Sequence, residues 1–248
     1  MTDPAILALV AFTFLLAGLV KGVVGMGLPL VALSLLTATL GLHSAMALIL
    51  FPSFFTNVWQ AAVGGKGLVI LRRIWPFLAL AVGTVWIGGR VHTWIGVEWL
   101  TVLLAILLTT YAIINLAGWR FRIAPEWERP TGPVAGVLNG LATGMTGTNI
   151  LPGVVYLQAI GLPKDELIQA LGIKFTLLTV ALALTMHGNG LLNAELGAVS
   201  TGAILPAFVG MWIGQRYRAS ISERMFQRFF FIALLVMGLF IGLQAFPR

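Results

Sequence analysis

Long charge-free stretches constrain this chain more than any other feature. A helix of about twenty residues is roughly 30 Å long, which matches the hydrocarbon thickness of a bilayer. The runs are continuously apolar and do not alternate with polar residues, so they do not fit a transmembrane β-barrel. The sequence therefore predicts an all-α, polytopic transmembrane helical bundle. The clearest runs without Lys, Arg, Asp or Glu are Trp99 to Trp119, Phe175 to Ala194, Leu196 to Gln215 and Phe229 to Pro247.

Composition excludes several other classes. Hydrophobic residues make up 59% of the 248 and charged residues only 9%, against roughly 25% charged in a soluble domain. The absence of cysteine excludes disulfides, thiolate metal sites and cysteine nucleophiles. The net charge of +7 is typical of the Lys and Arg that orient membrane proteins, so no nucleic-acid partner is expected. The start, Met1 to Pro4, lacks the basic region of a cleaved signal peptide, so the first segment is expected to be retained.

The chain contains an internal duplication. Residues 17–26 resemble residues 135–145, and Trp86 to Arg90 resembles Trp212 to Arg216, with offsets of 118 and 126 positions. This alignment pairs Lys21 with Asn139. We predict a first transmembrane repeat over 1–117, a cytoplasmic linker over 118–132 and a second repeat over 133–248. The expected segments are 4–24, 28–42, 44–63, 74–90 and 97–117 in the first repeat, and 133–146, 150–162, 164–187, 195–213 and 223–246 in the second.

Loop charges predict that the two repeats are inverted. The loop carrying Lys66, Arg72 and Arg73 has a counterpart at 187–190 without Lys or Arg, whereas the next loop is the more basic one in the second repeat, at 216–228. Because Lys and Arg collect on the cytoplasmic side, opposite bias in equivalent loops indicates opposite orientation. A multi-pass protein of the cell inner membrane, with both termini outside, is expected.

Each repeat begins with short segments interrupted by Gly and Pro, followed by three full helices. The interruptions are Gly22 to Pro29 and Gly140 to Pro152. Irregular backbone at membrane depth must line a cavity or be buried in protein, and paired interruptions in two repeats are typical of a transporter's substrate site. Helix N-termini at such a site favour an anion. The alternative is that these glycines only permit close helix packing.

Polar residues beside these interruptions are the candidate binding residues. A lysine at membrane depth costs about 2.5–3.5 kcal/mol on insertion scales, so it usually faces a cavity or a partner. For Lys174, a snorkelling side chain is the alternative. All eight acidic residues lie at termini, in loops or at segment ends, which favours anions over cations and gives no carboxylate for proton or sodium coupling. The candidates are Lys21, Gly25, Gly27, Asn139, Gly144, Thr146, Thr148, Asn149 and Lys174.

The motif from Gly18 through Gly22, Gly25 and Gly27 to Pro29, with its repeat, resembles the TauE/SafE family of sulfite exporters over essentially the whole chain. The resemblance implies transport of sulfite or sulfonates such as sulfoacetate, usually outward. We expect a secondary transporter that binds its anion near mid-membrane between the two interruptions and works by alternating access. No cofactor, metal or catalytic cluster is expected, and assembly into a homo-oligomer is compatible with the sequence. The alternatives are an anion channel with a fixed pore, an importer of a small organic anion and a membrane-embedded enzyme. Cation transport ranks below these, because the acidic rings or pairs expected for it are missing.

Overall fold

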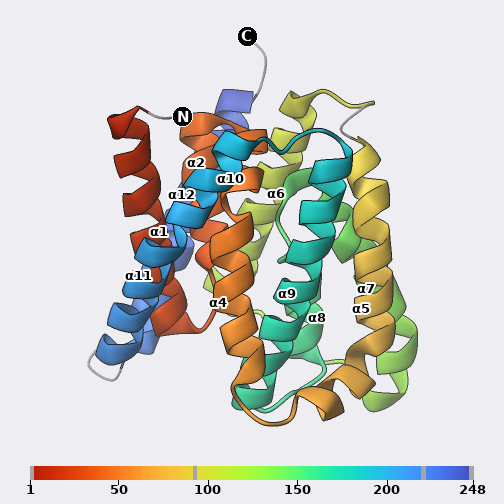
Figure 1. The fold of residues 1–248 in the computed structure, drawn as a ribbon. Helices are drawn as coiled ribbons and strands as arrows, with labels where there is room; N and C mark the ends of the chain where they lie inside the picture. The colour runs from red at the N-terminus through yellow and green to blue at the C-terminus, as the bar shows by residue number, and fades with distance from the viewer. Residues whose placement is uncertain (1–2, 92–93, 219–221, 246–248) are drawn as a thin grey trace. The chain divides into compact units, whose positions relative to one another are not determined.

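A computed structural model describes residues 3–91, 94–218 and 222–245, apart from the side chain of Glu223. Over these residues the chain is helical and contains no strand (Figure 1). The helices are α1 (Pro4–Val24), α2 (Leu28–Leu40), α3 (Leu42–Leu48), α4 (Leu50–Ala62), α5 (Gly67–Arg90), α6 (Val97–Leu116), α7 (Pro125–Thr146), α8 (Gly153–Ala159), α9 (Lys164–Gly188), α10 (Ala194–Gly202), α11 (Ile204–Tyr217) and α12 (Glu223–Ala245).

Six stretches are long and apolar enough to cross a membrane, which confirms the predicted polytopic helical class. They are α1, α5, α6, α9, the stretch over α10 and α11, and α12. The helices α3 and α4 meet at a 42° bend and would make a seventh span if counted together. The chain is therefore a multi-pass membrane protein.

The tryptophans support this assignment because all eight have exposed side chains. Their exposed fractions lie between 49% for Trp86 and 83% for Trp94. In water such exposure of large apolar rings is unfavourable, whereas indole rings are enriched at membrane interfaces, where one edge contacts lipid and the N–H contacts water. The surface of this protein is thus suited to a bilayer.

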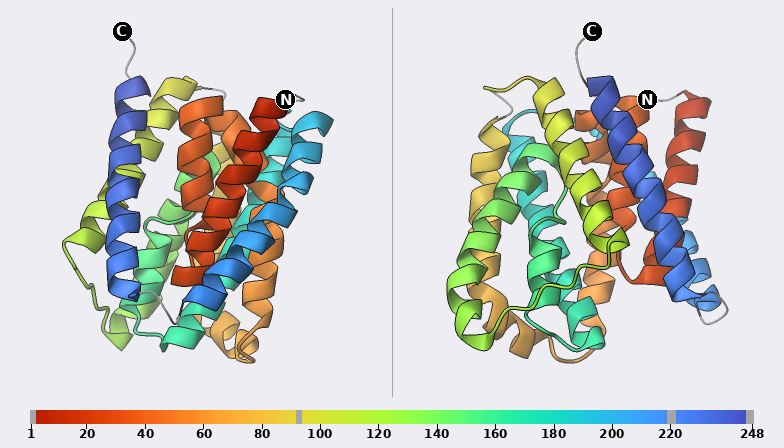
Figure 2. Two further views of the ribbon diagram at one scale, coloured as in Figure 1. Left: turned by 90° about the vertical axis from the view of Figure 1, so that its left-hand side faces the viewer. Right: turned by 180° about the vertical axis from the view of Figure 1, so that it is seen from behind.

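The described chain divides into two compact units. Unit 1 consists of residues 1–52, 96–119 and 190–248, and unit 2 of residues 53–95 and 120–189. Each unit therefore draws helices from both predicted repeats. Figure 2 shows the helices from two further sides.

In unit 1 the backbones of α1 and α11 lie in direct contact. A Cβ atom at Gly18 would be 2.1 Å from the carbonyl oxygen of Ala207, and one at Gly214 would be 2.3 Å from that of Leu19. Glycine on both helices thus sets the interhelical distance. The helix α12 packs against α6 and α2, and α10 packs against α3.

Unit 2 has the same kind of close backbone contact at glycines, between α5 and α7. A Cβ atom at Gly140 would be 2.1 Å from the carbonyl oxygen of Ala81, and one at Gly88 would be 2.4 Å from that of Leu141. The helix α9 packs against α5 and α7, and the short α8 contacts α7 and α9. The reciprocal pairing explains why glycines recur in both halves of the sequence.

Helix boundaries correct the alignment of the two halves. The helices α1 and α7 end at Val24 and Thr146, and α3 and α9 begin at Leu42 and Lys164, so both pairs are offset by 122 positions. The later helices α6 and α12 begin at 97 and 223, an offset of 126. The sequence alignment with an offset of 118 is wrong by about one helical turn. Lys21 corresponds to Thr143, and Asn139 corresponds to Ala17.

Several predicted segments match the helices to within one residue: α1, α6, α9 and α12. Other predictions need correction. Arg72 and Arg73 lie inside α5, which begins at Gly67, and α7 begins at Pro125, inside the segment predicted as a linker. The segments 44–63 and 195–213 are each divided between two helices. Hydropathy identifies the part of a helix that contacts lipid, but hydrogen bonding can extend the helix into charged turns outside it.

Candidate functional site

The second interruption is a six-residue segment, from Gly147 to Pro152, that joins α7 to α8 in unit 2. Gly147 ends α7 with a left-handed conformation, φ 73°, and its N–H donates to the carbonyl of Thr143 over 2.8 Å. Non-helical backbone has amide and carbonyl groups without helical partners, and inside a membrane protein these groups must be satisfied by other parts of the chain.

Two candidate residues satisfy carbonyls of this interruption. The ammonium of Lys174, on α9, donates a hydrogen bond to the backbone carbonyl of Asn149. The Nδ2 group of Asn139, on α7, donates to the carbonyl of Leu151 over 3.2 Å. The side chains of Lys174 and Asn139 are completely buried. Both residues therefore hold the interruption against its neighbouring helices.

Asn139 and Lys174 converge on the first residue of α8. A Cβ atom at Gly153 would lie 2.4 Å from Oδ1 of Asn139 and 2.9 Å from Cε of Lys174. Only glycine leaves room for both side chains here. Gly153 is not among the predicted site residues, although its position directly after Pro152, at the end of the interruption, is a signal in the sequence for it.

Two polar side chains at this interruption have buried atoms without a described hydrogen-bond partner. The Oδ1 atoms of Asn139 and Asn149 are buried and have no hydrogen-bond partner among the described residues. The backbone N–H of Thr148 donates to the hydroxyl of Thr146 over 3.3 Å, and that hydroxyl donates to the carbonyl of Ala142 over 2.7 Å. Buried polar groups without partners are uncommon in native proteins, and because both of these atoms are acceptors, the partner they call for is a donor such as water.

The position of Lys174 contradicts the snorkelling alternative. It is the eleventh residue of the 25-residue helix α9, its side chain is 0% exposed, and its ammonium lies 4.5 Å from the centre of the Phe175 ring. No described carboxylate lies within ion-pair distance of it; the described ion pairs of unit 2 join Lys66 to Glu166 and Arg73 to Glu128, each at 2.6 Å. Lys174 thus has its side-chain nitrogen inside the protein and not at the membrane surface.

The first interruption, in unit 1, is shorter and runs from Gly25 to Gly27. Both glycines have positive φ values, 85° and 110°, which L side chains rarely adopt. A Cβ atom at Gly27 would contact Val20 at 3.2 Å and Phe230 at 3.4 Å. Lys21 lies in the last turn of α1 and is 4% exposed. Unit 1 therefore also has a buried lysine, and this one lies one turn before the interruption.

Gly144 is in backbone contact with α5. A Cβ atom there would lie 2.2 Å from the carbonyl oxygen of Val85 and 2.6 Å from the nitrogen of Gly89. This contact supports the close-packing interpretation for Gly144, which aligns with Gly22 in the corrected register. The hydroxyl of Thr143, a residue that sequence analysis missed, donates to the carbonyl of Asn139 over 2.7 Å.

The acidic residues, which were expected at termini, in loops or at segment ends, lie at helix N-termini. Asp3 caps α1, and the others lie in the first turns of α6, α7, α9 and α10 or begin α12. Carboxylates there interact favourably with the helix dipole. Among the described residues, no group of three or more His, Asp or Glu side chains could hold a metal ion.

Multiple spanning helices and short helices joined by irregular, buried backbone define a class: polytopic helical membrane proteins with the broken helices of secondary transporters. The family described as "Sulfite exporter TauE/SafE" matches residues 10–241, and the chain belongs to this family. It is therefore a membrane transporter of sulfite-type or sulfonate-type anions. Searches of curated proteins and of solved structures found no match.

Proposed function

We propose that this chain is an exporter of sulfite or of an organosulfonate such as sulfoacetate across the inner membrane. It works by alternating access of two inverted repeats and is driven by the membrane potential. The observation that carries the proposal is Lys174, a completely buried lysine without a described carboxylate in ion-pair distance. Burial disfavours the charged form of a lysine, and a bound anion would stabilise that form.

The donors of the Lys174 side chain suit a sulfur oxyanion. An ammonium has three donors, and the interruption's Asn149 carbonyl accepts one of them. Hydrogen bonds between an ammonium and an anionic oxygen are charge-assisted and stronger than neutral ones. We assign Asn139, Thr146, Thr148 and Asn149 as the neighbouring polar groups for this anion.

Lys21, with Gly25 and Gly27, is assigned to the same function at the first interruption. Lys21 is 4% exposed inside an otherwise apolar helix. An ammonium held at that depth contributes positive potential to its surroundings and favours an anion over a cation.

The membrane potential supplies enough energy for export. Moving one charge through 100 mV changes the free energy by about 2.3 kcal/mol. A divalent anion leaving a cell at roughly 150 mV, negative inside, gains about 7 kcal/mol, which supports a gradient on the order of 10⁵. Import against this field would need a coupled ion, and the acidic residues that could bind a cation lie at helix N-termini.

Flux measurements in proteoliposomes test the proposal. Labelled sulfoacetate and sulfite are followed under an imposed potential of either sign for the wild type, Lys174→Met and Lys21→Met. Methionine keeps the length and removes the charge. The control Lys66→Gln removes a lysine whose side chain is 61% exposed. We expect potential-driven flux in the wild type and control, and loss of flux in Lys174→Met.

Three results would contradict parts of the proposal. Undiminished flux in Lys174→Met would overturn the assignment of that residue. Conductance far above carrier rates would replace the alternating-access carrier with a channel. Absence of flux of either anion under both potentials, in vesicles with folded protein, would overturn the proposed substrates.

A further inference from the structure

The backbone contact between α1 and α11 occurs a second time, between α7 and α5. Gly18 of α1 corresponds to Gly140 of α7 at the offset of 122 positions. A Cβ atom at Gly18 would lie 2.1 Å from the carbonyl oxygen of Ala207, and one at Gly140 would lie 2.1 Å from that of Ala81. Ala81 and Ala207 correspond at the offset of 126 positions. Equivalent atoms therefore meet in both contacts.

A second set of glycines repeats the pattern one turn further along. A Cβ atom at Gly22 would lie 2.3 Å from the carbonyl oxygen of Met211, and one at Gly144 would lie 2.2 Å from that of Val85. These residues correspond at the same two offsets. Each contact joins a helix of the first predicted repeat, α1 or α5, to a helix of the second, α11 or α7. The two repeats are thus interlocked by two copies of one contact.

Such contacts hold the joined helices together as one body. The backbones touch without side chains between them, and pulling them apart would remove van der Waals contact along the whole glycine stretch. Hydrogen bonds between the repeats add to this inside each unit. Ser200 donates to the carbonyl of Leu48 over 2.8 Å in unit 1, and Asn189 donates to the carbonyl of Gly89 over 2.9 Å in unit 2. Each unit is therefore a body composed of both repeats.

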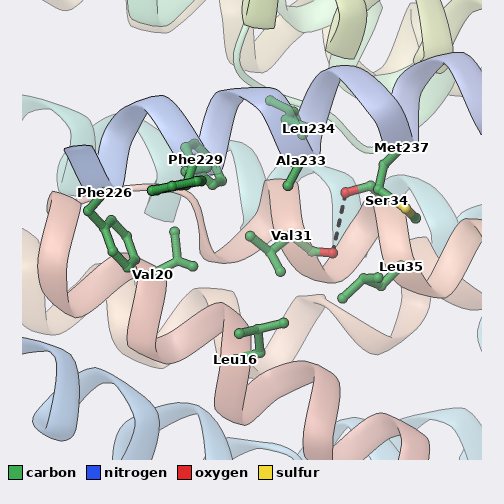
Figure 3. Close-up of a pocket in the computed structure, with 11 residues that line it drawn as sticks. Leu16, Val20, Val31, Ser34, Leu35, Phe226, Phe229, Ala233, Leu234 and Met237 are labelled. Atoms are coloured by element: carbon green, nitrogen blue, oxygen red, sulfur yellow. Dashed lines mark hydrogen bonds between the residues drawn. The ribbon is translucent and has the colours of Figure 1, made fainter. Parts of the chain in front are cut away.

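Unit 1 also joins the repeats around the first interruption. Side chains of α1 and α2, from the first repeat, and of α12, from the second, line a common groove (Figure 3). Phe230 of α12 lies in this lining, and its ring would be 3.4 Å from a Cβ atom at Gly27. A helix of the second repeat thus contacts the interruption of the first. Lys21 belongs to unit 1 with this interruption, whereas Lys174 and Asn149 belong to unit 2.

The chain passes between the two units near helix ends and in turns. These places follow Pro52, Ile95, Trp119 and Asn189. The first lies just after the 42° bend at Ile49, between α3 and α4. Gly118 and Gly190, beside the last two, have φ values of 70° and 68°. Bends and loop residues of this kind absorb the changes in φ and ψ when two rigid bodies move.

We propose that the two bodies that move during transport are units 1 and 2, each built from both repeats. The inference rests on the alternating access proposed above and specifies its moving parts. Lys21 moves with the first interruption on one body, and Lys174 moves with the second interruption on the other. Covalent links between the repeats inside one unit should leave transport intact, whereas distances between the units should change.

Two engineered disulfides test the first expectation, because the chain has no native cysteine. A Cβ atom at Gly242 would lie 3.4 Å from Cβ of Ala105 in unit 1, and one at Gly89 would lie 3.4 Å from Cβ of Thr185 in unit 2. These separations are close to the roughly 3.5–4.5 Å found in disulfides. Ala105→Cys with Gly242→Cys, and Gly89→Cys with Thr185→Cys, each link the two repeats within one unit. Sulfite flux in proteoliposomes is measured for each pair, reduced and oxidised.

Spin labels on the full-length chain test the second expectation. Lys66→Cys with Arg218→Cys places one label on each unit. Lys66→Cys with Val134→Cys places both labels on unit 2 but on different repeats, at side chains that are 61% and 60% exposed. Pulsed electron paramagnetic resonance measures both distances with and without sulfite and sulfoacetate.

We expect equal flux from the reduced and oxidised pairs, two values of the distance between the units, and one value of the distance within unit 2. Loss of flux on oxidation of either pair would overturn the proposal. A single distance between the units, or a changing distance within unit 2, would also overturn it. If a reduced pair is itself inactive, the spin-label distances decide. Wild-type protein without flux of either anion would instead contradict the proposed function.

Discussion

Lys174 and Asn149 are joined by a hydrogen bond from a completely buried ammonium to a main-chain carbonyl. The carbonyl belongs to the interruption between α7 and α8, and the lysine belongs to α9. The bond places the side-chain nitrogen of Lys174 beside irregular backbone inside unit 2. It gives Lys174 a structural role as well as the anion-binding role proposed for it.

Gly153→Ala tests whether Asn139 and Lys174 must converge on α8. The added methyl would lie 2.4 Å from Oδ1 of Asn139 and 2.9 Å from Cε of Lys174, so both side chains would have to shift. We expect loss of anion flux and a destabilisation of about 1–3 kcal/mol, measured by transport in proteoliposomes and by unfolding in detergent. In the control Gly83→Ala the methyl meets open space, and wild-type flux with unchanged or higher stability is expected. Wild-type flux in Gly153→Ala would show that transport does not need Asn139 and Lys174 in these positions.

Gly140→Ala tests the backbone contact between α7 and α5. The methyl would lie 2.1 Å from both the Ala81 carbonyl oxygen and the Thr84 hydroxyl, which forces the helices apart. A loss of about 1–3 kcal/mol in unfolding free energy is expected. The comparison variant Gly197→Ala places its methyl in open space on α10. Equal stability of the two variants would show that α5 and α7 do not depend on this close approach.

Ser200→Ala tests the bend between α3 and α4. The Ser200 hydroxyl, on α10, donates to the Leu48 carbonyl over 2.8 Å and accepts from the Phe51 N–H at 3.3 Å. Its removal leaves two backbone groups without this partner. We expect the free energy of unfolding to fall by about 1–3 kcal/mol, which appears as a lower Tm. Thr201→Ala is the matched control, because the exposed Thr201 hydroxyl bonds only within its own helix, to Gly197 at 2.8 Å. An unaltered Tm in Ser200→Ala would refute this role.

Single cysteines test the inverted orientation of the repeats. The chain contains no cysteine, so Lys66→Cys and Arg218→Cys each introduce one reactive site. Because both basic segments are predicted to be cytoplasmic, a membrane-impermeant thiol reagent should label both in inside-out vesicles and neither in right-side-out vesicles. Labelling of the two positions from opposite sides would rule out the inverted arrangement.

The sequence alone predicted the helical class and most helix positions. Continuous apolar runs of bilayer length determine that a segment is a spanning helix, and charged residues determine where the lipid-facing part ends. The interruptions were predicted from Gly and Pro, since these residues weaken the interior of a helix. The broken character of α3–α4 and of α10–α11 was not predicted, because their breaks at 49 and 203 contain ordinary apolar residues.

Composition and periodicity determined the spans, the interruptions and the location of the acidic residues outside the middle of the apolar segments. These properties depend on interactions with lipid, water and the local backbone, so they are readable from nearby residues. The register of the two halves, the partners of Lys174 and Asn139 and the packing role of Gly144 were decided only by the tertiary structure. Shifting the alignment of the two halves by four residues pairs nearly the same helix faces, so the sequence pattern does not fix the register. Contacts between distant segments depend on which helices pack together.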